Sequence, residues 1–252
     1  MSGNAPWPEG VGRHILDTVD STNAHAFRMA PQHAGPCWFL AGEQTAGRGR
    51  RARAWASPRG NFHATLLLRP TEPAATVALR SFAAALALRD AFVALTGLPG
   101  AFALKWPNDV LLNGGKVAGI LLESAGAGQG VAQLAIGIGV NLIAAPDASQ
   151  VEPGALRPVS LLGETGLRVT PEAFLNALAP AYAAWEQTFT QQGFAPLRRA
   201  WLDHAARLGQ PIRARTGTET REGIFEAIDE TGALILRQSH GSVAIPAAEV
   251  FF

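Results

Sequence analysis

Hydrophobic residues recur along the chain in short runs that are separated by glycine, proline and polar turn residues. Runs of this length, bounded by turn signals, are typical of buried β-strands. We therefore predict strands over residues 14–20, 38–44, 61–70, 101–107, 109–113, 116–124 and 131–142. Glycine-rich turns at 114–115 and 125–130 separate the last three of them.

Three other segments have the pattern of helices. Residues 76–96 are rich in alanine and leucine and lack internal glycine or proline, which predicts one long buried helix. Three consecutive residues that favour helix N-caps open the segment 20–30. The Thr-Pro-Glu sequence at 170–172 combines a cap, a first-turn proline and a first-turn acid, so a helix should begin there. Pro180 is expected to kink or split that helix.

From Gly209 onward the pattern changes to short strands that alternate with turns, such as the turn at 229–232. Four strands at a spacing of roughly ten residues predict a small β-barrel. We place a domain boundary near residue 208, between a larger α/β domain over 1–208 and the barrel over 209–252.

Composition limits the kind of protein this is. The chain has 252 residues, of which 48% are hydrophobic, so it can bury a sizeable core. Lysine and arginine total 21 against 20 for aspartate and glutamate. The net charge of +1 argues against general affinity for nucleic acid, because such binding needs many phosphate contacts. Any cluster of basic residues is therefore a local feature.

The single cysteine, Cys37, excludes a disulfide within the chain and is expected to leave no thiolate metal site. Its neighbours are apolar, which favours a buried structural thiol, and the six histidines lack a ligand spacing such as HxxxH. We therefore expect no resident metal. The N-terminal residues lack a signal-peptide pattern, and no apolar run reaches about eighteen residues. We expect a soluble cytoplasmic protein.

The segment TAGRGRRARAW, residues 45–55, places four arginines beside two glycines. Glycine lets the backbone approach a ligand closely, and guanidinium groups suit phosphate and carboxylate oxygens. A solvated basic loop is the alternative explanation. The glycines and the apolar strands on either side favour an ordered anion site.

Several polar residues stand in apolar surroundings. Lys105, Asn108 and Asp109 fall in a segment that a hairpin turn with a buried tryptophan would explain equally well. Lys116 opens an apolar strand, where it is either an edge gatekeeper or a cation aimed at an anionic intermediate. The residues at 21–23 either cap a helix or donate hydrogen bonds to a polar ligand.

Taken in order, these segments resemble the biotin–protein ligase family. The family's GRGRxGR loop appears as GRGRRAR at 47–53, its KWPND motif is intact at 105–109, and its KxxGIL stretch appears as KVAGIL at 116–121. DSTN at 20–23 and GIGVNL at 137–142 also fit. The resemblance covers nearly the whole chain. It implies an α/β (α+β) fold, with a mixed sheet and flanking helices of the class II aminoacyl-tRNA synthetase/biotin ligase type, plus a C-terminal SH3-like β-barrel.

The resemblance also implies a two-step reaction. The carboxylate of biotin attacks the α-phosphate of ATP in the presence of Mg²⁺, giving biotinyl-5′-AMP and pyrophosphate. The ε-amine of a lysine on a biotin carboxyl carrier protein then attacks the acyl carbonyl and expels AMP. Biotin, ATP and the carrier domain of a carboxylase are thus the implied partners, without nucleic acid or membrane. Exposed sheet edges could pair two subunits into a homodimer.

The resemblance assigns roles to single residues as well. Two anions must meet in the first step, so cations must offset their repulsion. Lys116 is expected to reach the biotin carboxylate and the α-phosphate, Arg48 and Arg50 to serve the acyl-phosphate and triphosphate, and Trp55 to close over the adenine. Asp109 is expected to orient or deprotonate the acceptor amine. The biotin-binding set is Ser21, Thr22, Asn23, Gln44, Arg48, Gly49, Arg50 and Lys116. The nucleotide-binding set is Arg48, Arg50, Trp55, Lys105 and Asn108.

The segment 47–55 is expected to close over the reactive adenylate and exclude water. Ala52 stands where the family has a glycine, which puts the loop geometry in doubt and makes Arg53 a weaker candidate. Arg51 is expected to face solvent. Only 20 residues precede Ser21, which is too few for the N-terminal helix-turn-helix of some relatives.

Three other interpretations remain open at this point. A lipoate–protein ligase or octanoyl transferase shares the fold and uses a carrier lysine, although KWPND together with GRGRRAR favours biotin. A nucleic-acid-binding module is disfavoured by the balanced charge and the single tyrosine. The third is a ligand-binding regulator without catalysis. The C-terminal barrel could bind ATP, bind the acceptor or stabilise the chain.

Overall fold

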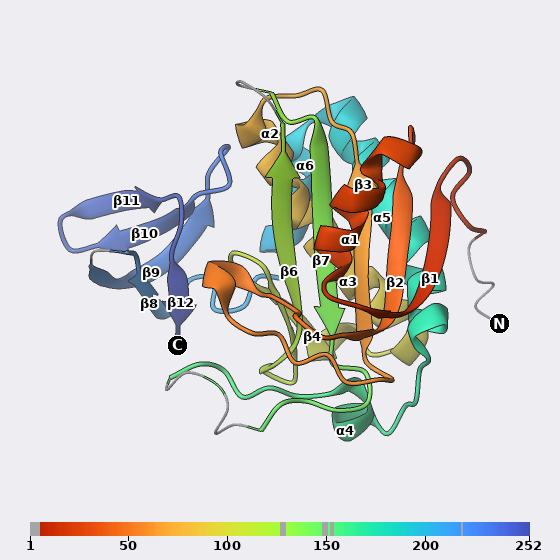
Figure 1. The fold of residues 1–252 in the computed structure, drawn as a ribbon. Helices are drawn as coiled ribbons and strands as arrows, with labels where there is room; N and C mark the ends of the chain where they lie inside the picture. Colours follow the sequence, from red (N-terminus) through yellow and green to blue (C-terminus); the bar gives the residue numbers. More distant parts are fainter. Residues whose placement is uncertain (1–5, 127–129, 148–150, 152–153, 218) are drawn as a thin grey trace.

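A seven-stranded mixed sheet forms the centre of the larger part of the protein (Figure 1). The structure is a computed structural model, which describes residues 6–126, 130–147, 151, 154–217 and 219–252, and of Ala52 the backbone alone. The strands are β1 (Gly12–Val19), β2 (Cys37–Gln44), β3 (Phe62–Leu68), β4 (Phe102–Lys105), β5 (Asp109–Leu112), β6 (Gly115–Ala125) and β7 (Gln133–Val140). Their order is β1-β2-β3-β7-β6-β5-β4; β1 and β2 are parallel, and the other neighbours are antiparallel.

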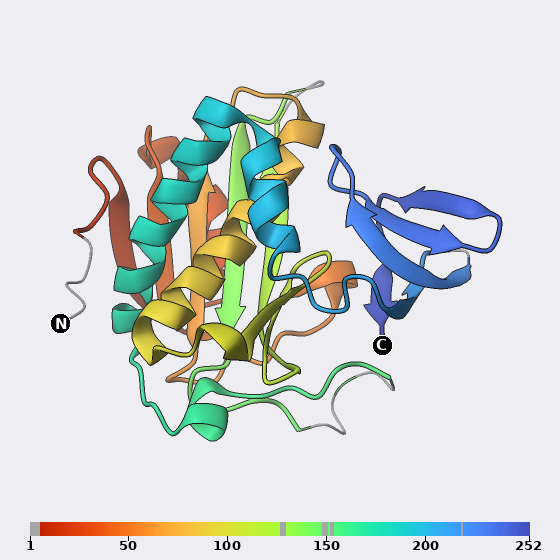
Figure 2. The same cartoon turned by 180° about the vertical axis from the view of Figure 1, so that it is seen from behind.

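Helices cover both faces of this sheet. The long helices α3 (Arg80–Thr96) and α5 (Pro171–Gln192) lie on one face together with α6 (Phe194–Leu202), as Figure 2 shows. The helix α1 (Thr22–Met29) lies on the other face, over β2, β3 and β7 (Figure 1). The remaining short helical elements are α2 (Ala74–Ala78), α4 (Leu161–Thr165), η1 (Ala30–Gln32), η2 (Arg50–Ala52) and η3 (Pro99–Ala101).

The core lies between the sheet and the α3–α5 layer. Every residue of β3 is buried, as expected for a central strand that is covered on both faces. Phe92 of α3 stacks on Phe102 of β4 and also packs against Phe174 of α5, with ring centroids 4.8 Å and 5.0 Å away. Because α3 is enclosed by the sheet and α5, it is apolar almost all round.

The predicted strands of the sheet are confirmed, with ends that shift by a few residues. The prediction of one helix over 76–96 is wrong, because the chain turns at Leu79 and α3 begins at Arg80. Arg80 is only 3% exposed, and its guanidinium is held by Glu72 and Glu186. The two ion pairs hold the first residue of α3 against the segment before α2 and against α5. Part of the predicted turn at 125–130 lies outside the described residues.

Pro180 was expected to kink or split its helix, and it does not split it. The helix α5 runs unbroken from Pro171 to Gln192. Buried side chains before and after the proline, Phe174, Leu178 and Tyr182 among them, pack into the core. Their burial outweighs the loss of one backbone hydrogen bond. The helix α6 was not predicted from the sequence. It is short and holds the buried Trp201 against the ring of Phe82.

The C-terminal segment forms a separate sheet beside the larger one (Figure 1). Its strands are β8 (Pro211–Arg215), β9 (Thr220–Ile228), β10 (Leu234–Gln238), β11 (Gly241–Ile245) and β12 (Glu249–Phe251). They pair antiparallel in the order β11-β10-β9-β8-β12. The predicted four-stranded barrel is thus corrected: in the part of the chain that is described there are five strands, and the sheet is open because β12 pairs with β8 alone.

None of the helices in the described residues is both long enough and apolar enough to cross a membrane.

Candidate functional site

A cavity of about 630 Å³ lies at the C-terminal ends of β1 and β2. The helix α1 follows β1, and the segment 45–55, called the arginine-rich loop below, follows β2. The floor of the cavity is formed by β6 and β7, and β12 of the C-terminal sheet closes one side. All residues that the sequence singled out for binding or catalysis line it: Ser21, Thr22, Asn23, Gln44, Arg48, Gly49, Arg50, Trp55, Lys105, Asn108, Asp109 and Lys116. These residues lie up to 95 positions apart in the sequence, from Ser21 to Lys116, and the fold brings them to one site.

One end of the cavity is neutral and polar. Ser21, Thr22 and Asn23 are at most 4% exposed at the start of α1. Ser21 stands at the N-cap position without making a side-chain capping bond, so capping does not account for it. The backbone N–H and the hydroxyl of Thr22 both donate to Oε1 of Gln44, at 2.8 and 3.0 Å. These groups form a preorganised set of uncharged donors and acceptors.

Glu123 holds this end in place from outside the lining of the cavity, and the sequence interpretation missed it. Its Oε2 accepts a hydrogen bond from Nδ2 of Asn23 at 2.7 Å. Its Oε1 lies 3.3 Å from Nη2 of Arg48, in a partly exposed ion pair. Glu123 thus connects the neutral end to the arginine-rich loop. Its position in the KxxGIL strand, three residues after Ile120, was the available signal.

The other end carries cations around one buried carboxylate. Nζ of Lys116 lies 2.7 Å from Oδ1 of Asp109, and Nζ of Lys105 lies 3.7 Å from Oδ2. Nη1 of Arg50 donates to Oδ1 of Asn108 over 3.4 Å. Asn108 in turn donates to the carbonyl oxygen of Ile120, which fixes the turn after β4. Three cations therefore converge at this end, where Asp109 is paired with both lysines and Glu249 of β12 is the other carboxylate on the cavity wall.

Burial and charge act in opposite directions on these groups. Burial alone would raise the pKa of Asp109, but the charges of Lys116, Lys105 and Arg50 outweigh it and hold that pKa below its ordinary value. Burial lowers the pKa of Lys105, an effect that Asp109 only partly offsets. Burial also lowers the pKa of Arg50. The cation end is thus short of negative charge, a condition that an anionic ligand relieves.

Trp55 lies across the floor between the two ends. A Cβ atom on Gly139 would come within 2.5 Å of its indole, and one on Gly119 within 3.2 Å. Nζ of Lys116 is 5.4 Å from the ring centroid, within cation–π range. Nε1 of Trp55 is buried without a hydrogen-bond partner. A Cβ atom on Gly137 would come within 2.4 Å of the side chain of Asn23. The glycines of β6 and β7 therefore leave room for the side chains of Trp55 and Asn23, which pack against them.

The arginine-rich loop is an ordered turn rather than a solvated tail. Its neck is closed by the hydrogen bond from Trp55 N–H to the Gly47 carbonyl oxygen, and its middle by that from Gly49 N–H to the Arg53 carbonyl oxygen. The residue with left-handed backbone dihedrals is Arg51, with φ of 56°. The left-handed backbone conformation, which favours glycine, therefore falls at Arg51, one position before Ala52.

Arg51 is exposed, as predicted, but its side chain is also paired. It forms an ion pair with Glu249 of β12, with 3.0 Å between Nη1 and Oε2, and Arg53 pairs with the other oxygen of the same carboxylate. Arg215 of β8 also contacts Glu249, at 2.6 Å. Burial opposes ionisation, yet hydrogen bonds from Arg53 and Arg215 lower the pKa of Glu249 to about 2. The sequence could not reveal this link, because a lone glutamate near the C-terminus belongs to no motif.

Glu249→Gln is expected to loosen the arginine-rich loop. The neutral amide cannot offset the arginines that converge on it, so trypsin should cut the unliganded loop several-fold faster. The cleavage rate is read by mass spectrometry of the loop peptides. Because the pKa of Glu249 is lowered to about 2, its ion pairs should hold from pH 8 down to pH about 4 and weaken only below.

Glu222→Gln is the matched control, since this glutamate of β9 lies in the same sheet outside the cavity. Equal cleavage of both variants and the unmodified protein would contradict the role of Glu249.

Comparisons with known proteins agree with this geometry. The model of the biotin/lipoate A/B protein ligase family matches residues 16–141, and that of the biotin protein ligase C terminal domain matches residues 208–252. The chain is 60% identical to biotin–[acetyl-CoA-carboxylase] ligase of Paracoccus denitrificans, over 94% of this chain and 99% of that protein. It is 32% identical to the bifunctional ligase/repressor BirA of Escherichia coli, over 91% of this chain and 70% of that protein. The biotin protein ligase from Aquifex aeolicus in complex with biotin and ATP has the same fold, with a TM-score of 0.80 at 24% identity over 95% of this chain and 97% of that one.

Proposed function

The chain belongs to the biotin/lipoate A/B protein ligase family, and from this premise we propose which residues carry each part of its reaction. The protein activates biotin with ATP and transfers the biotinyl group to a carboxylase. In the proposal, the activated species is biotinyl-5′-AMP and the acceptor is a lysine of the carboxylase's biotin carboxyl carrier domain.

The observation that carries the proposal is the chemical division of the cavity. One end offers uncharged donors and acceptors from Ser21, Thr22, Asn23 and Gln44. The other end offers excess positive charge. Biotin has matching ends, a neutral ureido ring and a carboxylate, and ATP adds a polyanion beside that carboxylate. The ureido ring is thus placed against α1 and the carboxylate toward Lys116.

In the first step, Lys116 offsets the repulsion between the biotin carboxylate and the α-phosphate. Its Nζ already stands next to a carboxylate, that of Asp109 at 2.7 Å, and its side chain is 31% exposed toward the cavity. Arg48 and Arg50 extend from the loop over the same space and serve the phosphate oxygens. Positive charge that is fixed before the reaction stabilises the pentacovalent phosphorus without further reorganisation. Asn108 and Lys105 position the nucleotide from below.

In the second step, Asp109 orients or accepts a proton from the acceptor amine. Its carboxylate stays ionised because the neighbouring lysines hold its pKa below the ordinary value. The attacking amine must be uncharged, so its proton has to be taken up within hydrogen-bond reach. Asp109 is the carboxylate of the cation end, next to the Lys116 ammonium that would hold the acyl-phosphate.

Mg²⁺ is the ion that the adenylation step implies. It keeps several water and phosphate ligands and needs only one or two protein oxygens. Oδ1 of Asn108 fits this need, because its hydrogen bond from Nη1 of Arg50 is long, at 3.4 Å, and leaves the oxygen available to an ion. The carboxylate of Asp109, by contrast, is already shared by two lysines. Asn108 would therefore hold the ion, whose charge would offset that of the phosphates.

Biotin-dependent ATP–pyrophosphate exchange tests the proposed function directly. We expect exchange with biotin and none with lipoate, together with calorimetric binding of biotin at one site per chain. Exchange that depends on lipoate instead would reassign the substrate, and binding of biotin without exchange would leave a regulator without catalysis.

The arginine-rich loop is expected to close over the adenylate. In the structure Trp55 lies on the floor glycines, so a nucleotide that stacks on the indole must displace it and reorder the loop with it. Trypsin cleavage within 47–55 should therefore fall several-fold when biotin and ATP are added together. ATP alone is the control, and unchanged cleavage with both ligands would argue against closure.

A further inference from the structure

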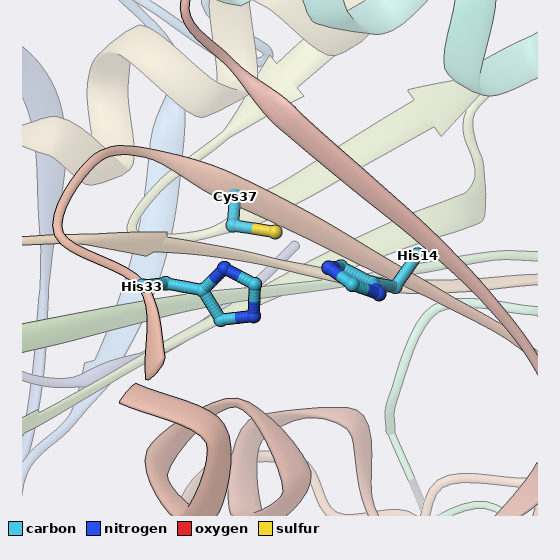
Figure 3. A group of neighbouring side chains, drawn as sticks. All are labelled: His14, His33 and Cys37. Carbon is cyan, nitrogen blue, oxygen red and sulfur yellow. The ribbon is translucent and has the colours of Figure 1, made fainter. Parts of the chain in front are cut away.

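A second group of chemically competent side chains lies at the opposite end of β1 and β2 from the cavity. His14 belongs to β1, His33 follows η1, and Cys37 is the first residue of β2. One ligand atom from each lies within 4.8 Å of the others, and Figure 3 shows the thiol and the two rings turned toward one another. None of the three lines the cavity. With ~3.3 Å per residue along β1, His14 is about 17 Å from Val19 at the cavity end of that strand.

The thiol is fixed at this point by the backbone around it. Cys37 is 1% exposed, and a Cβ atom on Gly12, its neighbour across the strand pair, would come within 2.9 Å of Sγ. The sulfur therefore fills space that only glycine leaves open. Its hydrogen bond, to the Trp38 carbonyl oxygen at 3.8 Å, is weak. Burial raises the pKa of Cys37 to about 11, so the uncomplexed thiol is protonated at neutral pH.

The two imidazoles leave a polar atom without a partner. Nε2 of His33 is buried and makes no hydrogen bond, which is uncommon for a buried side-chain nitrogen. His14 is exposed, so the group is open to solvent on one side. Packing explains where the rings lie, since His14 stacks on Phe39 at 5.3 Å and His33 meets the same ring edge-on at 5.4 Å. Packing alone does not explain why Nε2 of His33 has no hydrogen-bond partner.

We propose that His14, His33 and Cys37 form a binding site for a borderline-soft divalent cation of the Zn²⁺ class, with one coordination position open to solvent. Two imidazoles and one thiolate are ligands that Zn²⁺ prefers. On binding, the Cys37 S–H bond breaks, the proton leaves to solvent, and the sulfur and two neutral imidazole nitrogens each donate an electron pair to the ion.

The required movement is small. With metal–nitrogen bonds of ~2.0 Å and a metal–sulfur bond of ~2.3 Å, tetrahedral ligand atoms are about 3.3–3.6 Å apart. The group must therefore contract by about 1 Å from its present spacing, which rotation of the exposed His14 side chain can supply. The ion would tie the edge strand β1 to β2 and to the segment after η1. The prediction of no thiolate metal site relied on the single cysteine, and that of no resident metal also on the lack of a ligand spacing among the histidines. Neither observation can reveal ligands that come from two adjacent strands and a loop.

The test uses the intact protein with Co²⁺ and Zn²⁺ as probes. We expect one Zn²⁺ per chain in competition with a chromophoric chelator, and a near-ultraviolet thiolate-to-metal band with Co²⁺. His14→Asn should weaken binding by about tenfold or more, and Cys37→Ser should abolish the thiolate band. His25→Asn is the matched control, because His25 also contacts Phe39 edge-on but lies outside the group. It should bind as the unmodified protein does.

Stability gives an independent measurement. Zn²⁺ should raise the Tm of the unmodified protein and of His25→Asn, but not that of His14→Asn. His14→Asn changes an exposed residue far from the cavity, so it should fold and retain pyrophosphate exchange even if Cys37→Ser does not fold. Co²⁺ binding without a thiolate band, or equal affinity of His14→Asn and the unmodified protein, would overturn the proposal.

Discussion

Lys116→Ala is expected to reduce biotin-dependent ATP–pyrophosphate exchange on the order of 10²-fold or more. The first step brings the biotin carboxylate to the α-phosphate, and the Lys116 ammonium is the cation placed on the cavity floor, 2.7 Å from the buried Asp109. Without it, the charge that develops on the phosphoryl oxygens loses its closest fixed counter-charge. The loss should appear mainly in kcat, because the contact strengthens in the transition state.

Arg168→Ala is the matched control for this experiment. Arg168 is an exposed cation outside the cavity, so its removal changes the net charge equally but leaves the site intact. Biotin binding, measured by calorimetry, should weaken far less than exchange in the Lys116 variant. Exchange near that of the unmodified protein would exclude the role given to Lys116.

The sequence predicted which segments form the site through the motifs that it shares with the biotin–protein ligase family, not through its hydrophobic pattern. It could not decide between the gatekeeper and the ligand-facing interpretation of Lys116. That decision depends on the pairing of β5 with β6, where Asp109 lies opposite Gly119 and the register shifts between Val110 and Leu111. With this irregularity, the lysine side chain reaches Asp109 instead of solvent. A bulge leaves no clear mark in a single sequence.

The pattern of hydrophobic and polar residues could not predict contacts between residues that are far apart in the sequence. Glu249 is 196 positions from Arg53 in the sequence, and its carboxylate is held by arginines from the loop and from β8. The number of C-terminal strands was also misjudged, because the three-residue strand β12 has almost no periodicity of its own. Yet that strand brings Glu249 and Phe251 to the cavity, and the ring centroid of Phe252 lies 5.9 Å from Nζ of Lys105. The C-terminal sheet thus contributes directly to the wall of the site.

Asp109→Asn is expected to lower the free energy of unfolding by about 3–5 kcal/mol at pH 7. The carboxylate is the counter-charge of Lys105, whose side chain is 10% exposed, and of Lys116. An asparagine has nearly the same shape, so the loss measures charge and not packing. Urea unfolding followed by circular dichroism gives the value. Asp203→Asn, at an exposed position, should change stability by less than about 0.5 kcal/mol.

The variation of this loss with pH follows from the two pKa shifts. The pKa of Asp109 is lowered in the folded protein, so its contribution is complete above the unfolded value of about 4 and disappears as the pH falls below it. The pKa of Lys105 is also lowered, so protonated Lys105 opposes folding. In Asp109→Asn that penalty grows, and the variant should gain stability as the pH rises toward the ordinary lysine pKa.

A second substitution distinguishes an unpaired lysine from a general loss of structure. In Asp109→Asn, Lys105→Met removes the buried cation and keeps most of the side-chain volume, so the double variant should recover a large part of the lost stability. If instead the two losses add, the lysine was not the source of the instability, and the electrostatic account of the cation end fails. Recovery of stability without recovery of pyrophosphate exchange is the expected combination, because Lys105 also lines the nucleotide end of the cavity. The buried cations at that end would then lower the stability of the unliganded protein, and their role would be to bind the anionic substrates.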